Sequence, residues 1–247
     1  MENLEDLKKL VQKLKEETDN ETQILILQEI NKTILTKYVV QIGDDTIEPL
    51  WVEAYYYDPK SFPDCNTHMS DKQRKRFGQL YFHEKGRGGL DICLSCDDSY
   101  YLSILLKATL VYKKGDNSAG KRLKKQTEIY DVVNDTGLTE QDIEQMEHVL
   151  VKKENNSKVL NAVRINLQKP CFQDALLAAC PLYAVLDDYP ISFPKGYQKQ
   201  WKCSIRALSE ICDEEKAREK AKEYNNNAKI EEKYWNLAKE SLGYQSI

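Results

Sequence analysis

Residues 51–59 read WVEAYYYDP, an aromatic run typical of a β-strand that carries a single glutamate, Glu53. Alternate side chains of a strand point to the same side of a sheet. Trp51, Glu53 and Tyr55 therefore share one face. A buried charge is costly unless it is paired or used, so this acid indicates either a half-exposed sheet or a functional carboxylate.

Patterns around this stretch predict an α+β fold. Apolar residues at helical spacing predict two amphipathic helices near the start of the chain, and β-rich runs on both sides of Gly43 predict a hairpin. Further strands are expected within 78–95, 100–113, 159–169 and 200–208, and helices at 115–133, after Thr139, at 172–180 and from residue 213 onward. The sequence predicts one α+β domain flanked by helices.

Composition limits the classes of function. The chain has 247 residues, of which 41% are hydrophobic, and a formal net charge of −4, which supports a core and argues against a generic polyanion binder. No apolar run approaches the length of a membrane span, and the charged start predicts no signal peptide. Seven scattered cysteines predict free thiols in a reducing setting. We expect a cytoplasmic monomer without a membrane partner.

Three ionisable residues interrupt strands that are otherwise apolar: Glu53, Asp91 in GLDICLS and Lys107 in SILLKATLV. Each alone fits a strand edge or a solvent-facing position, but three together favour convergence on one site. Glu53 is the strongest candidate, because an acid among aromatic rings suits a general base. The rings themselves suit a flat ligand such as a nucleobase or a sugar, or else the filling of a core.

Two basic stretches, within 72–87 and 113–125, flank these strands. A cationic rim around an aromatic pocket with an acid is what an enzyme acting on a nucleic-acid base requires, since phosphate contacts position the substrate and the pocket reads the base. Runs of charge also occur on ordinary solvated faces.

Two other motifs have weaker support. Cys65-x-x-His68 with Cys93-x-x-Cys96 has the ligands of a zinc site, but positions 93 and 96 face opposite sides of a continuous strand. GRGG at 86–89 lacks the Lys-Ser/Thr ending of a phosphate-binding loop. We expect no metal and no cofactor.

The order of these features resembles one known family. VEAYYYDP, a histidine in a following loop, then LYFHEKGRGGLDICLS and LLKATLV are similar to the alkyladenine (3-methyladenine) DNA glycosylases, over roughly residues 38–110. The resemblance implies a single domain with a curved, mostly antiparallel sheet, N-terminal helices and, as an addition, a long C-terminal helix. We place the helices at 1–37, the glycosylase-like α+β domain at 38–210 and the C-terminal helical extension at 211–247.

The resemblance also implies roles for individual residues. Glu53 matches the catalytic glutamate, and Tyr55 and His68 match the pair that sandwiches the flipped base. Asp91 falls near the asparagine of the family's pocket, and Lys107 falls at the arginine beside the water. Both residues differ from those of the family. Aspartate carries a charge and only accepts hydrogen bonds, whereas asparagine is neutral and also donates. Lysine carries its charge on one ammonium group, whereas the planar guanidinium of arginine can donate two parallel hydrogen bonds.

Two other parts of the family's site are less closely matched: the side of the pocket next to the base, and the residue that is inserted into the DNA duplex. Trp51 is placed to support the wall beside the base. The tyrosine that the family inserts into the duplex has no clear counterpart, and His83 and Arg87 are both candidates for its place.

We expect DNA with a damaged or modified base as the partner, and hydrolysis of the N-glycosidic bond by a water that Glu53 activates. The alternative is a non-catalytic nucleic-acid or protein interaction module on the same type of fold. An open pocket lined by Glu53, Tyr55 and His68 would favour the enzyme, whereas a Glu53 sealed against Lys107 would favour the module.

Overall fold

The structure, a computed structural model, describes residues 4–74, 76–83, 89–114, 122–153, 159–162, 164 and 177–181. The expected C-terminal helical extension and the strand expected at 200–208 lie outside these residues. The helices within these residues include α1 (Glu5–Glu16), α2 (Asn20–Lys37), α3 (Ile129–Thr136) and α4 (Glu140–Gln145), with short 3₁₀ turns at η2 (Asp71–Gln73) and η4 (Gln126–Glu128).

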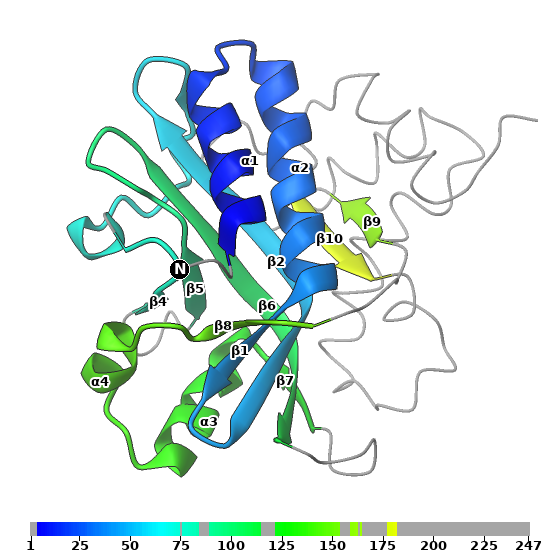
Figure 1. Ribbon diagram of the computed structural model, residues 1–247, viewed down its shortest axis with the longest axis vertical. Coiled ribbons are helices and arrows are strands. Elements are labelled where there is room, and N and C mark those ends of the chain that lie inside the picture. The colour runs from blue at the N-terminus through cyan, green and yellow to red at the C-terminus, as the bar shows by residue number, and fades with distance from the viewer. Residues whose placement is uncertain are drawn as a thin grey trace, which may run out of the picture.

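Within the described residues, ten strands form one sheet. They are β1 (Tyr38–Ile42), β2 (Asp45–Asp58), β3 (Phe62–Pro63), β4 (Leu80–Phe82), β5 (Leu90–Cys93), β6 (Tyr101–Lys113), β7 (Arg122–Lys125), β8 (Leu150–Lys152), β9 (Val159–Ala162) and β10 (Ala178–Pro181). The main order is β4-β5-β6-β2-β1-β8, and every pairing is antiparallel. The sheet curls around a helical layer (Figure 1), which confirms the α+β class and the antiparallel sheet.

The long strands β2 and β6 form the centre of the sheet, paired from Asp45↔Lys113 to Tyr57↔Tyr101. Their register shifts between Pro49 and Val52. Proline has no N–H to give to a sheet ladder and is tolerated in strands at such bulges. Pro49 thus accounts for the bulge that immediately precedes Glu53.

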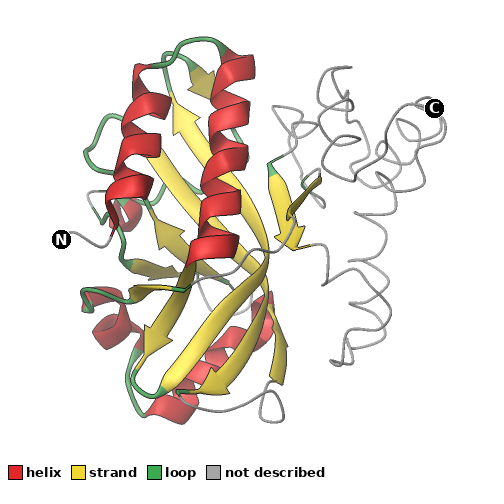
Figure 2. Cartoon of the chain, turned by 45° about the vertical axis from the view of Figure 1, so that its right-hand side comes forward, coloured by secondary structure: helices red, strands yellow, loops and turns green. Residues whose placement is uncertain are grey.

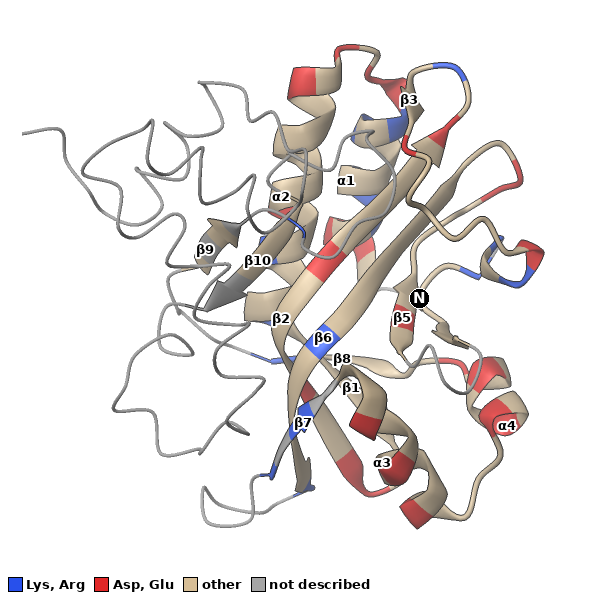
Figure 3. Ribbon diagram, turned by 180° about the vertical axis from the view of Figure 1, so that it is seen from behind, with Lys and Arg blue, Asp and Glu red and all other residues tan. Residues whose placement is uncertain are grey.

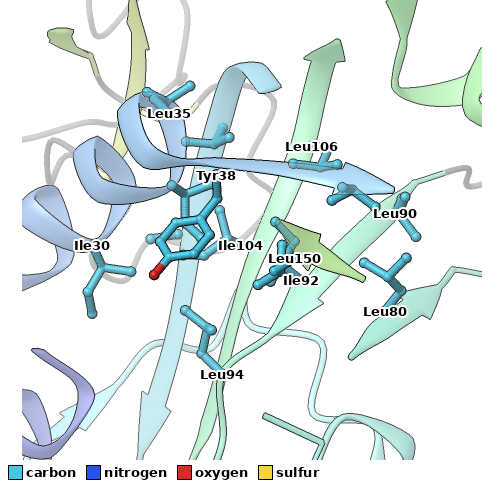
Figure 4. Packing of buried hydrophobic residues seen from close by; sticks show 14 of the residues in the cluster. Ile30, Leu35, Tyr38, Leu80, Leu90, Ile92, Leu94, Ile104, Leu106 and Leu150 are labelled. Carbon is cyan, nitrogen blue, oxygen red and sulfur yellow. The ribbon is translucent and has the colours of Figure 1, made fainter. Parts of the chain in front are cut away.

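Helices α1 and α2 cover one face of the sheet (Figure 2). Figure 4 shows Ile30 and Leu35 of α2 in one buried cluster with Ile104 and Leu106 of β6, and all four are fully buried. Ile104 and Leu106 pair with Ala54 and Val52, so these β2 side chains also face the helices. Glu53 must therefore point to the opposite face, as the alternation of residues 51–59 predicts.

Two predicted helices are wrong in part. Arg122–Lys125, expected in a helix, forms β7 on β6, and Ala178–Pro181, expected at the end of a short helix, forms β10 between β2 and β9. In both cases a long strand offers unpaired N–H and C=O groups at its side, and pairing with that edge outweighs local helix propensity. The two helices expected in 1–37 and the strands around Gly43 are confirmed.

Among the residues that the structure describes, no helix is both long and apolar enough to cross a membrane. Cys93 and Cys96 are free thiols as expected, but the expectation is wrong at Cys65, which takes part in a disulfide.

Candidate functional site

The side of the sheet away from α1 and α2 carries the lone charges. Tyr81 of β4, Asp91 of β5, Leu105 of β6 and Glu53 of β2 pair in one continuous row across four strands. Figure 3 views this side, with acidic positions on β2 and β5 and a basic position on β6 between them. Since neighbouring strands lie about 5 Å apart, two strand steps separate Asp91 from Glu53 by about 10 Å.

Glu53 is completely buried. Its Oε2 accepts a hydrogen bond of 2.9 Å from the Tyr55 hydroxyl and lies 3.8 Å from the Lys107 Nζ. Its Oε1 is also buried and makes no hydrogen bond within the described part of the chain. A buried carboxylate oxygen without a donor is costly, so this atom is suited to accept a proton or a hydrogen bond from a water or a ligand.

Tyr55 holds one side of the carboxylate. Burial, together with the charge of Glu53, raises the pKa of the Tyr55 phenol well above its ordinary value. The hydroxyl thus stays protonated and remains a donor to Glu53. The guanidinium of Arg164 lies 4.7 Å from the centre of the Tyr55 ring, a cation–π contact that fixes the ring in place.

Arg164 is itself fully buried and is anchored on the loop after β3. Its Nη1 donates to Asp64 Oδ2 at 2.7 Å and to the backbone oxygen of Ala54 at 3.3 Å. Burial lowers the pKa of Arg164, but the charges of Asp64, Tyr55 and Glu53 and the hydrogen bond to Asp64 together outweigh it, so the pKa is raised and the guanidinium stays positively charged. This ion pair joins β2 to the loop that leads to His68.

Lys107 closes the other side of Glu53. Its Nζ lies 5.8 Å from the centre of the Trp51 ring, and Trp51 is 2% exposed. The Lys107 side chain keeps 15% of its surface exposed. Lys107 is thus the more exposed member of this pair, since Glu53 has no exposed surface.

A second group forms around Asp91, which is 2% exposed. Its Oδ2 accepts from Ser103 Oγ at 2.7 Å and from Gln73 Nε2 at 2.8 Å, and its Oδ1 lies 2.9 Å from His83 Nε2. These three partners hold the Asp91 carboxylate in one orientation, with Oδ1 turned toward the His83 ring.

Three rings lie together at this second group. The ring centres of His68 and His83 are stacked at 5.2 Å, and that of Tyr81 lies 5.1 Å from His83 and 6.0 Å from His68. Burial lowers the pKa of His83, but the nearby Asp91 carboxylate outweighs it and the pKa is raised. His83 therefore gains positive charge at a higher pH than an ordinary histidine.

The predicted site residues thus fall into two groups on one face. Glu53, Tyr55, Lys107 and Trp51 form the first, and Asp91, His83 and His68 form the second. Arg87 lies outside the described residues. The sequence reasoning missed five residues that complete the two groups: Asp64, Gln73, Tyr81, Ser103 and Arg164.

Of the missed residues, Arg164 carried a usable signal. It is a single charge within the apolar segment VLNAVRINL, the same pattern that identified Glu53, Asp91 and Lys107. Ser103 and Gln73 carried none, because neutral polar residues are common in strands and loops.

Most cations of the predicted rim that the structure describes are paired within the protein. Arg76 contacts Glu144 at 3.5 Å, Lys113 contacts Asp45 at 2.7 Å, and Arg122 and Lys124 each contact an aspartate of α3 at 3.9 Å. These described cations serve the fold. Lys72 and Lys114 are exposed at the surface.

The zinc site considered from the sequence lacks one of its four ligands. Cys65 is in a disulfide and cannot serve as a thiolate. Within the described ranges there is no group of three His, Cys, Asp or Glu side chains placed to hold a metal ion.

The absence of a side chain at Gly89 lets its backbone lie close to Leu105 of β6 and to the His83 ring. Its φ is +148°, and a Cβ there would come within 3.0 Å of Leu105 Cδ1 and 3.2 Å of His83 Cδ2. We expect Gly89→Ala to lower the free energy of unfolding by about 1–3 kcal/mol, because both the backbone and these contacts are strained. Urea unfolding measures it. Gly43→Ala is the control, since Gly43 also has a positive φ but has nothing within 4 Å. An equal loss in the two variants would contradict the crowding at Gly89.

No protein-family model matches the sequence, and a comparison with curated proteins finds no match.

Proposed function

We propose that the protein is a monofunctional DNA glycosylase, which flips out an alkylated or otherwise modified base and hydrolyses its N-glycosidic bond. The observation that supports it is Glu53: a buried carboxylate with one oxygen held by Tyr55 and close to Lys107, and the other without a hydrogen bond in the described structure. The resemblance of residues 38–110 to the alkyladenine DNA glycosylases points to the same residue.

In this proposal Glu53 Oε1 takes a proton from the water that attacks C1′. The negative charge of Glu53 also stabilises the oxocarbenium-like transition state that develops on the sugar. Tyr55 keeps the carboxylate in one orientation, and Lys107 lies close enough to orient the water or a phosphate. No cofactor is required for this hydrolysis.

The second group would receive the flipped base. The stacked rings of His68 and His83, with Tyr81 at their edge, provide aromatic surfaces about one nucleoside away from Glu53. Extrusion of a base costs a few kcal/mol and costs least for damaged or mispaired bases, which contributes selectivity. Tyr55 and Trp51 would support the wall nearer the sugar.

The experiment is detection of free base after the purified protein is incubated with duplex DNA that carries methylated purines or other modified bases. Chromatography with mass detection identifies each released base. The proposal predicts release of at least one modified base, with an abasic site left in the strand. No release of free base from any of the modified duplexes, under conditions where the protein binds the DNA, would contradict it.

A non-catalytic nucleic-acid-binding module on this fold is the second candidate. The complete burial of Glu53 beside Lys107 favours it, because a sealed acid cannot reach a substrate without movement of the site. The module binds DNA with no base released and is unaffected by Glu53→Gln, so the same assay separates the two functions.

A further inference from the structure

We propose that the amine of Lys107 forms a Schiff base with the sugar of an abasic site, and that the protein then cuts the DNA strand on the 3′ side of that sugar. This inference goes beyond the proposed function, because the reaction proposed above ends at the abasic sugar and has water as its only nucleophile. The second reaction takes abasic DNA as its substrate, whatever process has removed the base.

Lys107 places an amine next to the proposed reaction centre. Its Nζ lies 3.8 Å from Oε2 of Glu53, the residue proposed to direct water to C1′. Among the described side chains of the two groups on this face, Lys107 is the only one with a primary amine. The family that residues 38–110 resemble has an arginine here, and a guanidinium, which stays protonated, does not form a Schiff base.

The backbone of Lys107 is fixed while its amine is adjustable. The residues on both sides of it pair with β2, Leu106 with Val52 and Ala108 with Trp51, and Ala108 also pairs with β7. A lysine carries its amine on a flexible stem of four carbons. The side chain keeps 15% of its surface exposed, so Lys107, unlike Glu53, presents surface to solvent.

The formation of a Schiff base requires a carbonyl group, a neutral amine and an acceptor for the proton of the ammonium group. An abasic deoxyribose supplies the carbonyl, because its C1′ exchanges between a closed ring and an open-chain aldehyde. The carboxylate of Glu53, beside the ammonium, is the acceptor. Partly buried lysines beside such groups are the ones that enzymes use as Schiff-base nucleophiles.

Trp51 stabilises the imine once it has formed. The centre of its ring lies 5.8 Å from Lys107 Nζ, and the residue is 2% exposed. An imine returns to the aldehyde when water adds to it, and an apolar ring beside the nitrogen restricts the access of water. The face of the ring also attracts the positive charge of an iminium nitrogen.

The first step balances with the groups present. The ammonium of Lys107 gives a proton to Glu53, and the neutral Nζ bonds to C1′ while the electron pair of the carbonyl bond goes to its oxygen. The second amine proton moves to that oxygen. Glu53 then returns its proton, the oxygen leaves as water, and an iminium ion joins the lysine to C1′.

The second step breaks the strand. Oε1 of Glu53, which makes no hydrogen bond within the described part of the chain, takes a proton from C2′. The electron pair of that C–H bond forms a double bond between C2′ and C3′, and the phosphate leaves C3′ with the electrons of the C–O bond. Water hydrolyses the imine, which restores the lysine and leaves an unsaturated aldehyde. No oxidant or reductant is consumed.

The experiment uses a duplex with one preformed abasic site and sodium cyanoborohydride, a hydride donor that reduces an imine to a stable amine. We expect the native protein to become covalently joined to this DNA. Without the hydride donor, we expect it to cut the strand at the abasic site. Protease digestion of the adduct, followed by mass spectrometry, should locate the sugar on Lys107, and this readout requires no variant.

Two variants test the role of the amine. Lys107→Arg keeps a positive charge beside Glu53 but has no amine, and it should lose both the adduct and the cut. The control is Lys113→Arg, since Lys113 lies about 20 Å further along β6 and its side chain is 53% exposed beside Asp45. A reaction of abasic DNA with any accessible lysine would use Lys113 as readily, so this variant should keep both.

The absence of an adduct with native protein, or an adduct on a lysine other than Lys107, overturns this inference. Base release from modified duplexes is assayed separately, so the two proposals fail independently. Base release without an adduct overturns the Schiff base and leaves the glycosylase standing. An adduct on Lys107 with no base released from any modified duplex supports the Schiff base and overturns the glycosylase.

Discussion

Replacement of Glu53 by glutamine is expected to lower the rate of base release by about 10³-fold, as expected for loss of a general base that also stabilises charge. The amide keeps the shape of the side chain, and its one oxygen can still accept from the Tyr55 hydroxyl in the place of Glu53 Oε2. It has neither the negative charge nor the basic oxygen that the attacking water requires. Chromatographic assay of free base under single-turnover conditions measures the change.

The matched control for this variant is Glu48→Gln. Glu48 lies on the same strand β2, is 8% exposed and pairs with Lys153 at 2.7 Å, remote from the row that contains Glu53. It should leave base release unchanged. DNA binding by Glu53→Gln should equal that of native protein, and base release at the native rate in this variant would exclude the mechanism.

Replacement of Arg164 by methionine is expected to lower the free energy of unfolding by about 3–5 kcal/mol, the usual loss when one partner of a buried ion pair is removed. Asp64 would keep its charge with no exposed surface and without its contact at 2.7 Å. The Tyr55 ring would also lose the guanidinium that covers it. Urea unfolding, followed by circular dichroism, measures the loss.

Two variants test the cause of that loss. Arg122→Met removes an exposed pair with Asp135, in which both side chains are at least half exposed, and should cost about 1 kcal/mol or less. The double variant Arg164→Met with Asp64→Leu removes both buried charges and should recover part of the stability. A double variant less stable than Arg164→Met alone would show that the loss does not come from an orphaned charge.

The face of each residue in β2 could be predicted from the sequence because the strand period is local. Glu53 and Tyr55 share a face in any straight strand, and their contact at 2.9 Å follows from that geometry. The charges of Asp91 and Lys107 were recognised as unusual for the same reason. The residues that contact Asp91 and Lys107 could not be predicted, because they depend on the order of the strands in the sheet and no local sequence pattern encodes that order.

The hydrogen bonds of Asp91 illustrate what the sequence lacks. Gln73 comes from a turn 18 residues earlier and Ser103 from a strand 12 residues later. Both reach the carboxylate only because β5 lies beside β6 and the turn folds over this edge. The strand β7 was mistaken for a helix for a similar reason, since its partner β6 supplies the pairing.

The bulge at Pro49 has a consequence for how the sequence of this protein can evolve. Beyond it, β2 presents Val52 and Ala54 to the helices and Glu53 to the opposite face. Adding or deleting one residue in this part of the strand would exchange the two faces and place the acid in the apolar layer. Descendants that keep the acid on its present face are therefore expected to differ in β2 by substitution and to preserve its length.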